Sequence, residues 1–178
     1  MKKFFSWLLI LQSLSLIIVG LYAFYVQQTP STLAFSNYSA TNSVQANGLM
    51  PTNITISDLG IDLPVYQAAI VNNVWPTSST GAEYLTSSPL PGSTGNSIIY
   101  AHDWVSLFGP LRSAKVGQKV VVTYPDKTKK TFVIAYTSIV PYNQSSILAS
   151  SNDKRITLYT CTGFLDSERF VAVAILKS

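Results

Sequence analysis

The stretch RITLYTCTGFLDSERFVAVAILK, residues 155–177, contains the pattern that decides the fold of this chain. Two runs of β-branched, aromatic and other apolar residues flank a short segment that contains Gly163. Runs of this kind, bounded by Gly, Asp and Ser, are typical of consecutive β-strands. The stretch therefore predicts two neighbouring strands, with Cys161 at the end of the first strand and next to a loop.

Short runs of the same composition recur upstream, namely NITISDLGIDLPVYQAAI (53–70), NSIIYAH (96–102), QKVVVTY (118–124) and KTFVIAYTSIV (130–140). Pro125 and Asp126 begin the clearest turn, between two alternating runs. The pattern predicts an all-β fold of about seven strands, closed into a barrel or stacked as a sandwich. Helix is scarce, and residues 106–114 and 145–151 each suit one short helical turn.

The N-terminus carries a segment suited to a membrane, KKFFSWLLILQSLSLIIVGLYAFYV at residues 2–26. Residues 4–26 carry no charge and match the roughly 20 apolar residues that a spanning helix needs. Because Lys2 and Lys3 flank this segment, the positive-inside rule predicts a cytoplasmic N-terminus and an extracellular remainder. The alternative is a signal peptide cleaved after Ala34, but the apolar segment exceeds the roughly 7–15 residues of a signal core. We expect an uncleaved, single-pass anchor in the cell membrane.

The rest of the chain divides into a polar linker and one domain. Residues 27–50 are rich in Ser, Thr, Asn and Gln and carry no charge, which is typical of a flexible or weakly ordered stalk. Residues 51–178 carry the strand pattern and are long enough for one compact domain. Residues 1–26, the cytoplasmic tip and transmembrane anchor, complete the predicted organisation. The formal net charge of +4, to which Lys2 and Lys3 contribute two, gives no support to nucleic-acid binding.

The single cysteine and the single histidine of the chain lie at comparable places, each at or just after the end of a predicted strand. One cysteine cannot form a disulfide within its own chain, so Cys161 is buried and inert, linked to another chain, or reactive. A thiol with a pKa of about 8.5 needs a base or a positive neighbour to ionise, and His102 supplies both if the two strands are neighbours. Arg169, on the following strand, is suited to stabilise the oxyanion of an acyl-transfer reaction. These residues form a candidate catalytic set.

This set resembles the sortases, the membrane-anchored cysteine transpeptidases of bacterial surfaces. TLYTC at 157–161 is similar to the TLxTC strand of that family, with Arg169 downstream and GNSIIYAH, 95–102, upstream. The resemblance extends over ITISDLGIDLPVY, PLPGSTG and LFGPLRSAKVGQKVVV, and thus over nearly the whole external domain. It implies a sortase-like β-barrel of about seven to eight strands with one or two short helices. Ala101 stands where the family commonly has glycine, and the interval between Cys161 and Arg169 is shorter than in several branches, so the branch stays open.

The resemblance also implies a role for each residue. Cys161 would be the nucleophile that forms a thioacyl-enzyme, and His102 would act as general acid and then as base. Arg169 would position the substrate or stabilise the oxyanion, and Thr160 would lie beside the bound sorting motif. The implied substrate is an LPxTG-like sorting signal of a secreted surface protein, and the implied acceptor is an amine of a cell-wall precursor or a pilin lysine. Such an enzyme attaches proteins to the cell surface or polymerises pilins.

Residues 141–153, PYNQSSILASSND, form the loop with which this family reads its sorting signal, and their composition predicts an apolar, hydrogen-bonded groove. No cofactor or metal is expected. Glu83 is the only acidic residue between Leu63 and His102, which is too few oxygen ligands for a calcium site. One cysteine and one histidine leave a structural zinc site two protein ligands short.

Two other functions stay open at the level of sequence. Ser151 and Lys154 have the S-x-x-K spacing of hydrolases in which a lysine activates a serine, although the companion motifs S-D-N and K-T-G do not occur. The second alternative is a membrane-tethered β-domain for adhesion or assembly, in which Cys161 and His102 are only structural.

Overall fold

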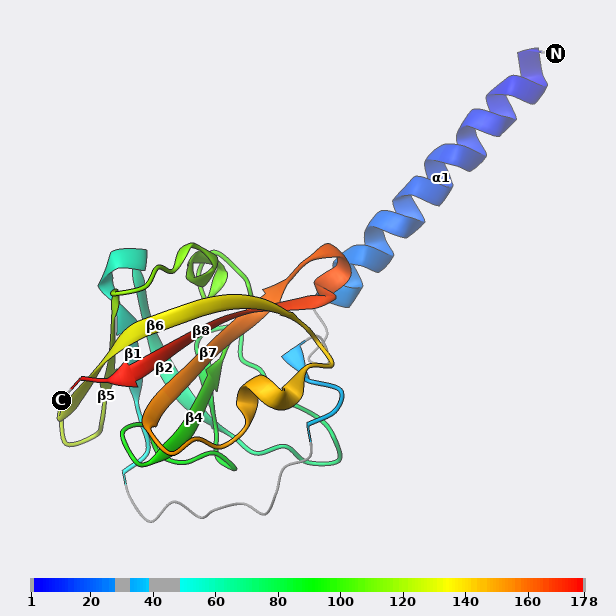
Figure 1. Cartoon of the computed structure of the whole chain (residues 1–178). Coiled ribbons are helices and arrows are strands. Elements are labelled where there is room, and N and C mark those ends of the chain that lie inside the picture. The colour runs from blue at the N-terminus through cyan, green and yellow to red at the C-terminus, as the bar shows by residue number, and fades with distance from the viewer. Residues whose placement is uncertain (1, 28–32, 39–48, 178) are drawn as a thin grey trace.

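Eight β-strands close into a barrel beside a long N-terminal helix (Figure 1). This computed structural model describes residues 2–27, 33–38 and 49–177. The strands follow each other around the barrel in the order β1-β2-β3-β4-β7-β8-β6-β5. Their bounds are β1 Asn53–Ile56, β2 Ile61–Ala68, β3 Ala82–Leu85, β4 Gly95–Tyr100, β5 Lys119–Thr123, β6 Lys129–Pro141, β7 Lys154–Thr162 and β8 Glu168–Leu176. The predicted all-β barrel of about seven to eight strands is confirmed.

The loops of the barrel contain short 3₁₀ helices, namely η2 Ser57–Leu59, η3 Gly109–Ser113, η4 Ser145–Leu148 and η5 Phe164–Asp166. Of these, η3 and η4 lie where the sequence predicted helical turns. The other two, η2 and η5, are single turns too short to leave a periodic pattern. The sequence pattern also missed β3, because its four residues are too few to show an alternation.

The position of β7 brings the candidate residues together. β7 pairs in parallel with β4, and Tyr100 lies opposite Tyr159 in that ladder. On its other edge β7 pairs antiparallel with β8, and Cys161 lies opposite Arg169. Because β4 and β7 run in the same direction, the chain leaves both strands at the same end of the barrel. His102, two residues after Tyr100, therefore lies at the same level as Cys161.

The barrel interior is an apolar core, called the inner core below. Alternate residues of each strand point into it because successive side chains of a strand face opposite sides. Its fully buried members include Ile54, Ile56, Tyr84, Ile99, Phe108, Leu111, Val120, Val122, Phe132, Ile134, Ile156, Leu158, Ala172 and Ala174. Each large aliphatic side chain buried in this way stabilises the fold by about 1.5–3 kcal/mol.

A second apolar layer, the outer core, covers the outer face of β3, β4, β7 and β8. Its members are Leu33, Phe35, Ala68, Trp75, Leu85, Ile98, Tyr100, Val140, Leu148, Tyr159, Cys161, Val171 and Val173. Tyr100 and Tyr159 stack with ring centroids 5.3 Å apart, and Trp75 packs edge-on against Tyr100. The candidate nucleophile is therefore part of a covered outer face and not of the barrel interior.

Residues 33–38, called the strap below, supply part of that cover. Leu33 and Phe35 are 0% and 1% exposed, and the Phe35 ring packs edge-on against Tyr159 at 5.1 Å. The expectation of a flexible stalk over 27–50 is therefore wrong for the strap. The physical reason is that the LAF triplet supplies two large apolar side chains, Leu33 and Phe35, and the barrel buries both. Residues 28–32 and 39–48 lie outside the described part of the chain.

The N-terminal helix α1 spans Lys2–Gln27 and projects from one end of the barrel (Figure 1). Its stretch Ser6–Tyr25 has a mean hydropathy of 2.1 and is not buried against the rest of the protein. The helix is long and apolar enough to cross a membrane, as predicted. Its C-terminal end contacts η5, the turn between β7 and β8.

Candidate active site

Cys161 lies near the end of β7, on the outer face of the barrel. Its direct partner across the strand pair is Arg169, so both side chains point to the same face. The Cys161 side chain is only 2% exposed, beneath the outer core. A thiol and a guanidinium in adjacent positions provide a nucleophile and a fixed positive charge at one place.

His102 follows β4 directly and is 5% exposed. The backbone N–H of Ala101 donates to the Tyr159 carbonyl at 3.4 Å, so the chain still follows β7 at this point. The imidazole stacks on the ring of Trp104, with centroids 4.7 Å apart and planes 10° apart. The stacking holds the ring in one plane at the end of the barrel that carries Cys161.

The environment of His102 favours its neutral form. Burial lowers the pKa of His102, and the negative charge of Asp103 opposes this only in part. Desolvation disfavours the imidazolium because a charged ring loses more hydration energy than a neutral one. At neutral pH His102 is therefore able to accept a proton, as a general base must.

Arg169 is 2% exposed and anchored by backbone carbonyls. One terminal nitrogen donates to the carbonyls of Asp166 at 2.7 Å and Glu168 at 2.8 Å, and the other donates to the carbonyl of Ala34 in the strap at 2.8 Å. Its Nε has no hydrogen-bond partner within the described residues. The guanidinium is thus held rigidly by η5 while one of its nitrogens points at a peptide carbonyl.

Thr160 is fully buried, and its hydroxyl donates to the carbonyl of Ala101 at 2.8 Å. Because residues alternate along β7, this side chain lies on the opposite face from Cys161. The contact fastens the end of β7 to the residue that precedes His102. The side chain therefore positions the candidate catalytic residues, and contact between Thr160 and a bound sorting motif stays a prediction.

The strap lies across this face and forms hydrogen bonds along its length. The hydroxyl of Tyr159 donates to the Leu33 carbonyl at 3.1 Å. The backbone N–H of Ser36 donates to the Tyr142 carbonyl at 3.2 Å, and the Ser145 hydroxyl donates to the Asn37 carbonyl at 3.2 Å. The strap thus connects β7 and β8 with the loop between β6 and β7. Its Ala34 carbonyl lies against Arg169, and its Leu33 and Phe35 belong to the same apolar layer as Cys161.

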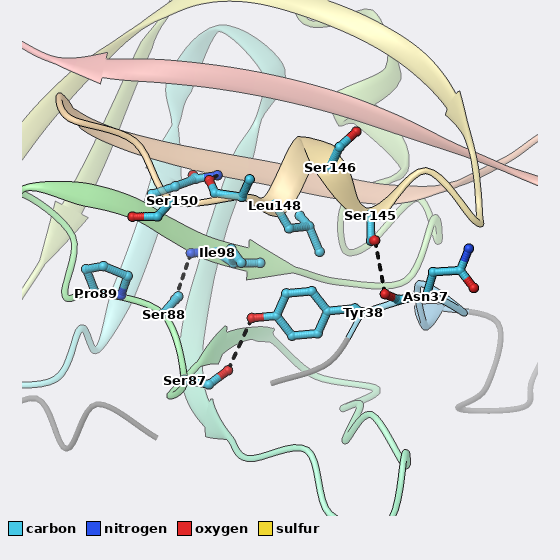
Figure 2. Close-up of a pocket in the computed structure, with 12 residues that line it drawn as sticks. Asn37, Tyr38, Ser87, Ser88, Pro89, Ile98, Ser145, Ser146, Leu148 and Ser150 are labelled. Atoms are coloured by element: carbon cyan, nitrogen blue, oxygen red, sulfur yellow. Dashed lines mark hydrogen bonds between the residues drawn. The ribbon is translucent and has the colours of Figure 1, made fainter. Parts of the chain in front are cut away.

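A cavity of about 570 Å³ opens on the same face, towards the start of β4. Figure 2 shows its walls, which are formed by the strap, the loop before β4 and η4. Eight of the twelve lining residues carry a hydroxyl or amide group, and Ile98 and Leu148 are among the four apolar ones. No residue of the lining is charged. The prediction of a hydrogen-bonded, partly apolar groove beside residues 141–153 agrees with this cavity.

Glu83 is a buried carboxyl group that sequence analysis did not assign to the site. It lies on β3 opposite Tyr100 and is 2% exposed, and neither of its oxygens has a hydrogen-bond partner among the described residues. Burial raises the pKa of Glu83 to about 8. The group is therefore protonated at neutral pH. The signal in the sequence was a lone acid inside the apolar run AEYL.

Ser151 and Lys154, the residues of the serine-lysine alternative, lie at or just before the start of β7, at the opposite end from Cys161. Ser151 donates its hydroxyl to the Asp153 carbonyl at 3.4 Å, and Lys154 is exposed at the start of β7. Asp153 forms an ion pair with Arg155 at 2.6 Å. Within the described residues, no group of three or more His, Cys, Asp or Glu side chains is arranged to hold a metal ion.

Comparison with known proteins connects this geometry to one family. Residues 54–177 match the family model for the sortase domain. Sortase A of Listeria monocytogenes is 27% identical over 129 residues, which cover 70% of this chain and 55% of that protein. The chain thus matches about half the length of this curated relative.

Solved structures show the same fold. Sortase A from Corynebacterium diphtheriae has a TM-score of 0.64 at 22% identity, over 92% of this chain and 82% of that chain. Sortase C1 of Streptococcus agalactiae, in complex with MTSET, has a TM-score of 0.63 at 18% identity, over 92% and 86% of the two chains.

Proposed function

Because this chain belongs to the sortase family, we propose that it is a cysteine transpeptidase that cleaves an LPxTG-like sorting signal and transfers the acyl group to an amine. The observation that carries the proposal is the register of the barrel. It sets Cys161 opposite Arg169 and brings His102 to the end of the neighbouring strand. This register supports the proposal, because the candidate nucleophile, base and oxyanion donor lie at the same end of the barrel.

In the first half-reaction, the sulfur of Cys161 attacks the carbonyl carbon that precedes the scissile bond. The neutral imidazole of His102 accepts the thiol proton and passes it to the nitrogen of the leaving group as the C–N bond breaks. The product is a thioester between the enzyme and the N-terminal part of the substrate. A neutral His102 at rest suits this order of proton transfers, since it must first act as a base.

In the second half-reaction, an amine attacks the thioester and the C–S bond breaks. His102 takes the proton of the incoming amine and returns a proton to the sulfur. Arg169 stabilises the oxyanion in both halves, because its guanidinium already donates to a carbonyl oxygen at this place. The hydrogen bond from Arg169 to the Ala34 carbonyl supports this role, because it shows that the guanidinium can bind a peptide carbonyl there.

Access to the thiol requires the strap to move. Cys161 is 2% exposed beneath Leu33 and Phe35, so no peptide reaches its sulfur while the strap is packed. The uncharged cavity at the far end of the same face then receives the N-terminal part of the sorting motif. Its hydroxyl and amide groups are suited to bind peptide backbone and neutral side chains.

We further propose that α1 anchors the enzyme in the cell membrane with the barrel outside. In this arrangement the substrate is a sorting signal of an exported surface protein. The acceptor is an amine of a cell-wall precursor or a pilin lysine. The three regions 1–26, 27–50 and 51–178 then serve as anchor, linker and catalytic domain.

The proposal is tested by trapping the thioester. The full chain in detergent is incubated with a pool of LPxTG-like peptides and analysed by intact-mass spectrometry after acid quench. We expect a mass increase equal to one acyl fragment, confined to the peptide that contains Cys161. Cys161→Ala should abolish both adduct and cleavage, whereas Ser151→Ala, the matched control for the serine-lysine alternative, should retain both. Cleavage that survives Cys161→Ala would refute the proposal.

A further inference from the structure

The loop after the candidate nucleophile exposes large apolar side chains. Phe164 and Leu165 of η5 are 84% and 43% exposed. The loop between His102 and η3 adds Val105, which is 89% exposed. Both loops lie at the same end of the barrel, since they follow β4 and β7, which pair in parallel. We call Val105, Phe164 and Leu165 the apical patch, and exposed apolar patches of this kind mark interaction sites.

The backbone of η5 is held in a shape that its residues do not favour. Leu165 and Asp166 have φ values of 51° and 58°, a left-handed conformation that leucine rarely adopts. Arg169 holds this shape by donating to the Asp166 carbonyl at 2.7 Å. Within the protein, the exposed tip gains no burial from this arrangement. A local conflict of this kind is found mainly where a function requires it.

The apical patch lies where the chain leaves the apolar helix. η5 contacts the C-terminal end of α1 (Figure 1). The apolar span of α1 ends at Tyr25, and Tyr22 lies one turn earlier, which is the placement of aromatic residues at a membrane–water interface. The exposed surface of α1 therefore continues directly into the exposed tip of η5.

We propose that the apical patch inserts into the outer interface of the lipid bilayer and holds the catalytic end of the barrel against the membrane surface. The partner is the bilayer itself. The tip is suited to it because Phe164 and Leu165 are uncharged, while Asp166 is 9% exposed and turned inward. This proposal rests on the proposed membrane anchorage of α1 and is independent of the proposed chemistry.

The consequence for the reaction is a preference for substrates that lie at the membrane. Cys161 and Arg169 flank η5 directly in the sequence, so insertion of η5 fixes the reacting groups close to the headgroups. A sorting peptide that is itself tethered to the membrane reaches this position more readily than one in bulk solution. The apical patch thereby selects how the peptide is presented and not which residues it contains.

Spin labels measure this contact without reference to activity. Phe164→Cys is made in the Cys161→Ala background of the full chain, labelled with a nitroxide and reconstituted into phosphatidylcholine–phosphatidylglycerol vesicles. Leu16→Cys in α1 and Lys129→Cys at the opposite end of the barrel are the matched controls. The collision rate of each label is then measured with lipid-soluble oxygen and with a water-soluble nickel chelate.

We expect the labels at positions 164 and 16 to collide more often with oxygen, and the label at position 129 with the nickel chelate. A label at position 164 that behaves like the one at position 129 would overturn the proposal while leaving the anchorage of α1 intact. Exposure of position 16 to the nickel chelate would overturn both. Protection of position 164 from both reagents would indicate that another protein covers the patch, which also contradicts the proposal.

A second variant tests the consequence. Phe164→Ser combined with Leu165→Asn removes the apolar tip, and asparagine tolerates the left-handed backbone at position 165. We expect unchanged turnover of a soluble sorting peptide and a severalfold loss with the same peptide coupled to a vesicle lipid. If the ratio of variant to wild-type turnover were the same for the soluble and the lipid-coupled peptide, the preference for membrane-bound substrate would be overturned.

Discussion

The two apolar layers of this protein, on either side of the same strands, differ in what they bury. The inner core is filled by aliphatic and aromatic side chains on alternate residues of the barrel. The outer core contains Cys161 and lies beside the buried Glu83, His102 and Arg169. Within the described residues, no buried carboxylate, imidazole or guanidinium points into the barrel. The side chains of the inner core therefore point into the barrel, and the candidate catalytic side chains lie on its outer face.

The difference shows where this fold tolerates unfavourable burial. Glu83 and the Nε of Arg169 are buried without hydrogen-bond partners, and each such group costs about 1–3 kcal/mol or more. The closed barrel supplies the stability that offsets the cost of burying these groups. The outer core is closed by the strap and by the loop that carries Trp75, so it can open while the barrel stays intact.

Of the three variants, Arg169→Lys on the outer face should have the largest effect, and the quantity that it lowers is kcat/KM. Lysine keeps the charge but lacks the planar fork that donates to Asp166, Glu168 and Ala34 at once. We expect kcat/KM to fall about 10²–10³-fold, the usual effect of losing an oxyanion donor. Steady-state kinetics with thermal unfolding separate this loss from misfolding. Arg155→Lys, at the ion pair with Asp153, is the control, and equal effects of both variants would remove the special role of Arg169.

Glu83→Gln should make the protein more stable, with an effect that depends on pH. Below pH 4.5 the carboxyl is protonated in both folded and unfolded states. Between pH 4.5 and about 8 it is ionised only in the unfolded state, so the wild type loses stability as the pH rises. At pH 7 we expect the variant to be more stable by about 3 kcal/mol. Chemical denaturation of both proteins at pH 4, 6 and 8 measures the difference, and a gap that does not grow with pH would contradict the assignment.

Phe35→Ala should have the smallest effect, and that effect should be confined to the strap. Loss of the ring that packs on Tyr159 and lies 5.8 Å from the Arg169 guanidinium weakens the strap, while the pairing between the barrel strands is unchanged. We expect alkylation of Cys161 by a small thiol reagent to become about tenfold faster, which corresponds to about 1.4 kcal/mol in the opening of the strap. Tyr38→Phe, which removes only the 3.4 Å contact with Ser87, is the control. An unchanged alkylation rate would show that the strap does not limit access.

Alternation marks β2 and β5, because one buried face leaves a period of two in the sequence. β4, β7 and β8 are buried on both faces, so continuous runs of β-branched, aromatic and other apolar residues predicted them instead. The ends of the strands in 96–102 and 155–161 also predicted where His102 and Cys161 lie. The pattern cannot show that β4 and β7 are parallel neighbours, since that pairing joins residues about sixty positions apart through side chains common to any strand.

The polar composition of residues 27–50 predicted a flexible stalk, and this prediction fails at the strap for a physical reason. Residues 27–50 are polar on average, but Leu33 and Phe35 find a complementary apolar surface that exists only after the barrel has formed. The sequence marked Glu83 only as a lone acid inside an apolar run, and its burial depends on packing that exists only in the folded protein. Average composition describes what a segment does alone, and these features depend on long-range packing.

The position of β8 between β7 and β6 has a consequence for how the protein matures. β8 follows every other strand of the barrel in the chain, yet the barrel cannot close without it. Until it arrives, β7 lacks one neighbour, Arg169 is absent and Cys161 has no covered face around it. Long-range closure of this kind is slow compared with local pairing. The thiol therefore gains Arg169 as its cross-strand partner only when β8 has joined the barrel.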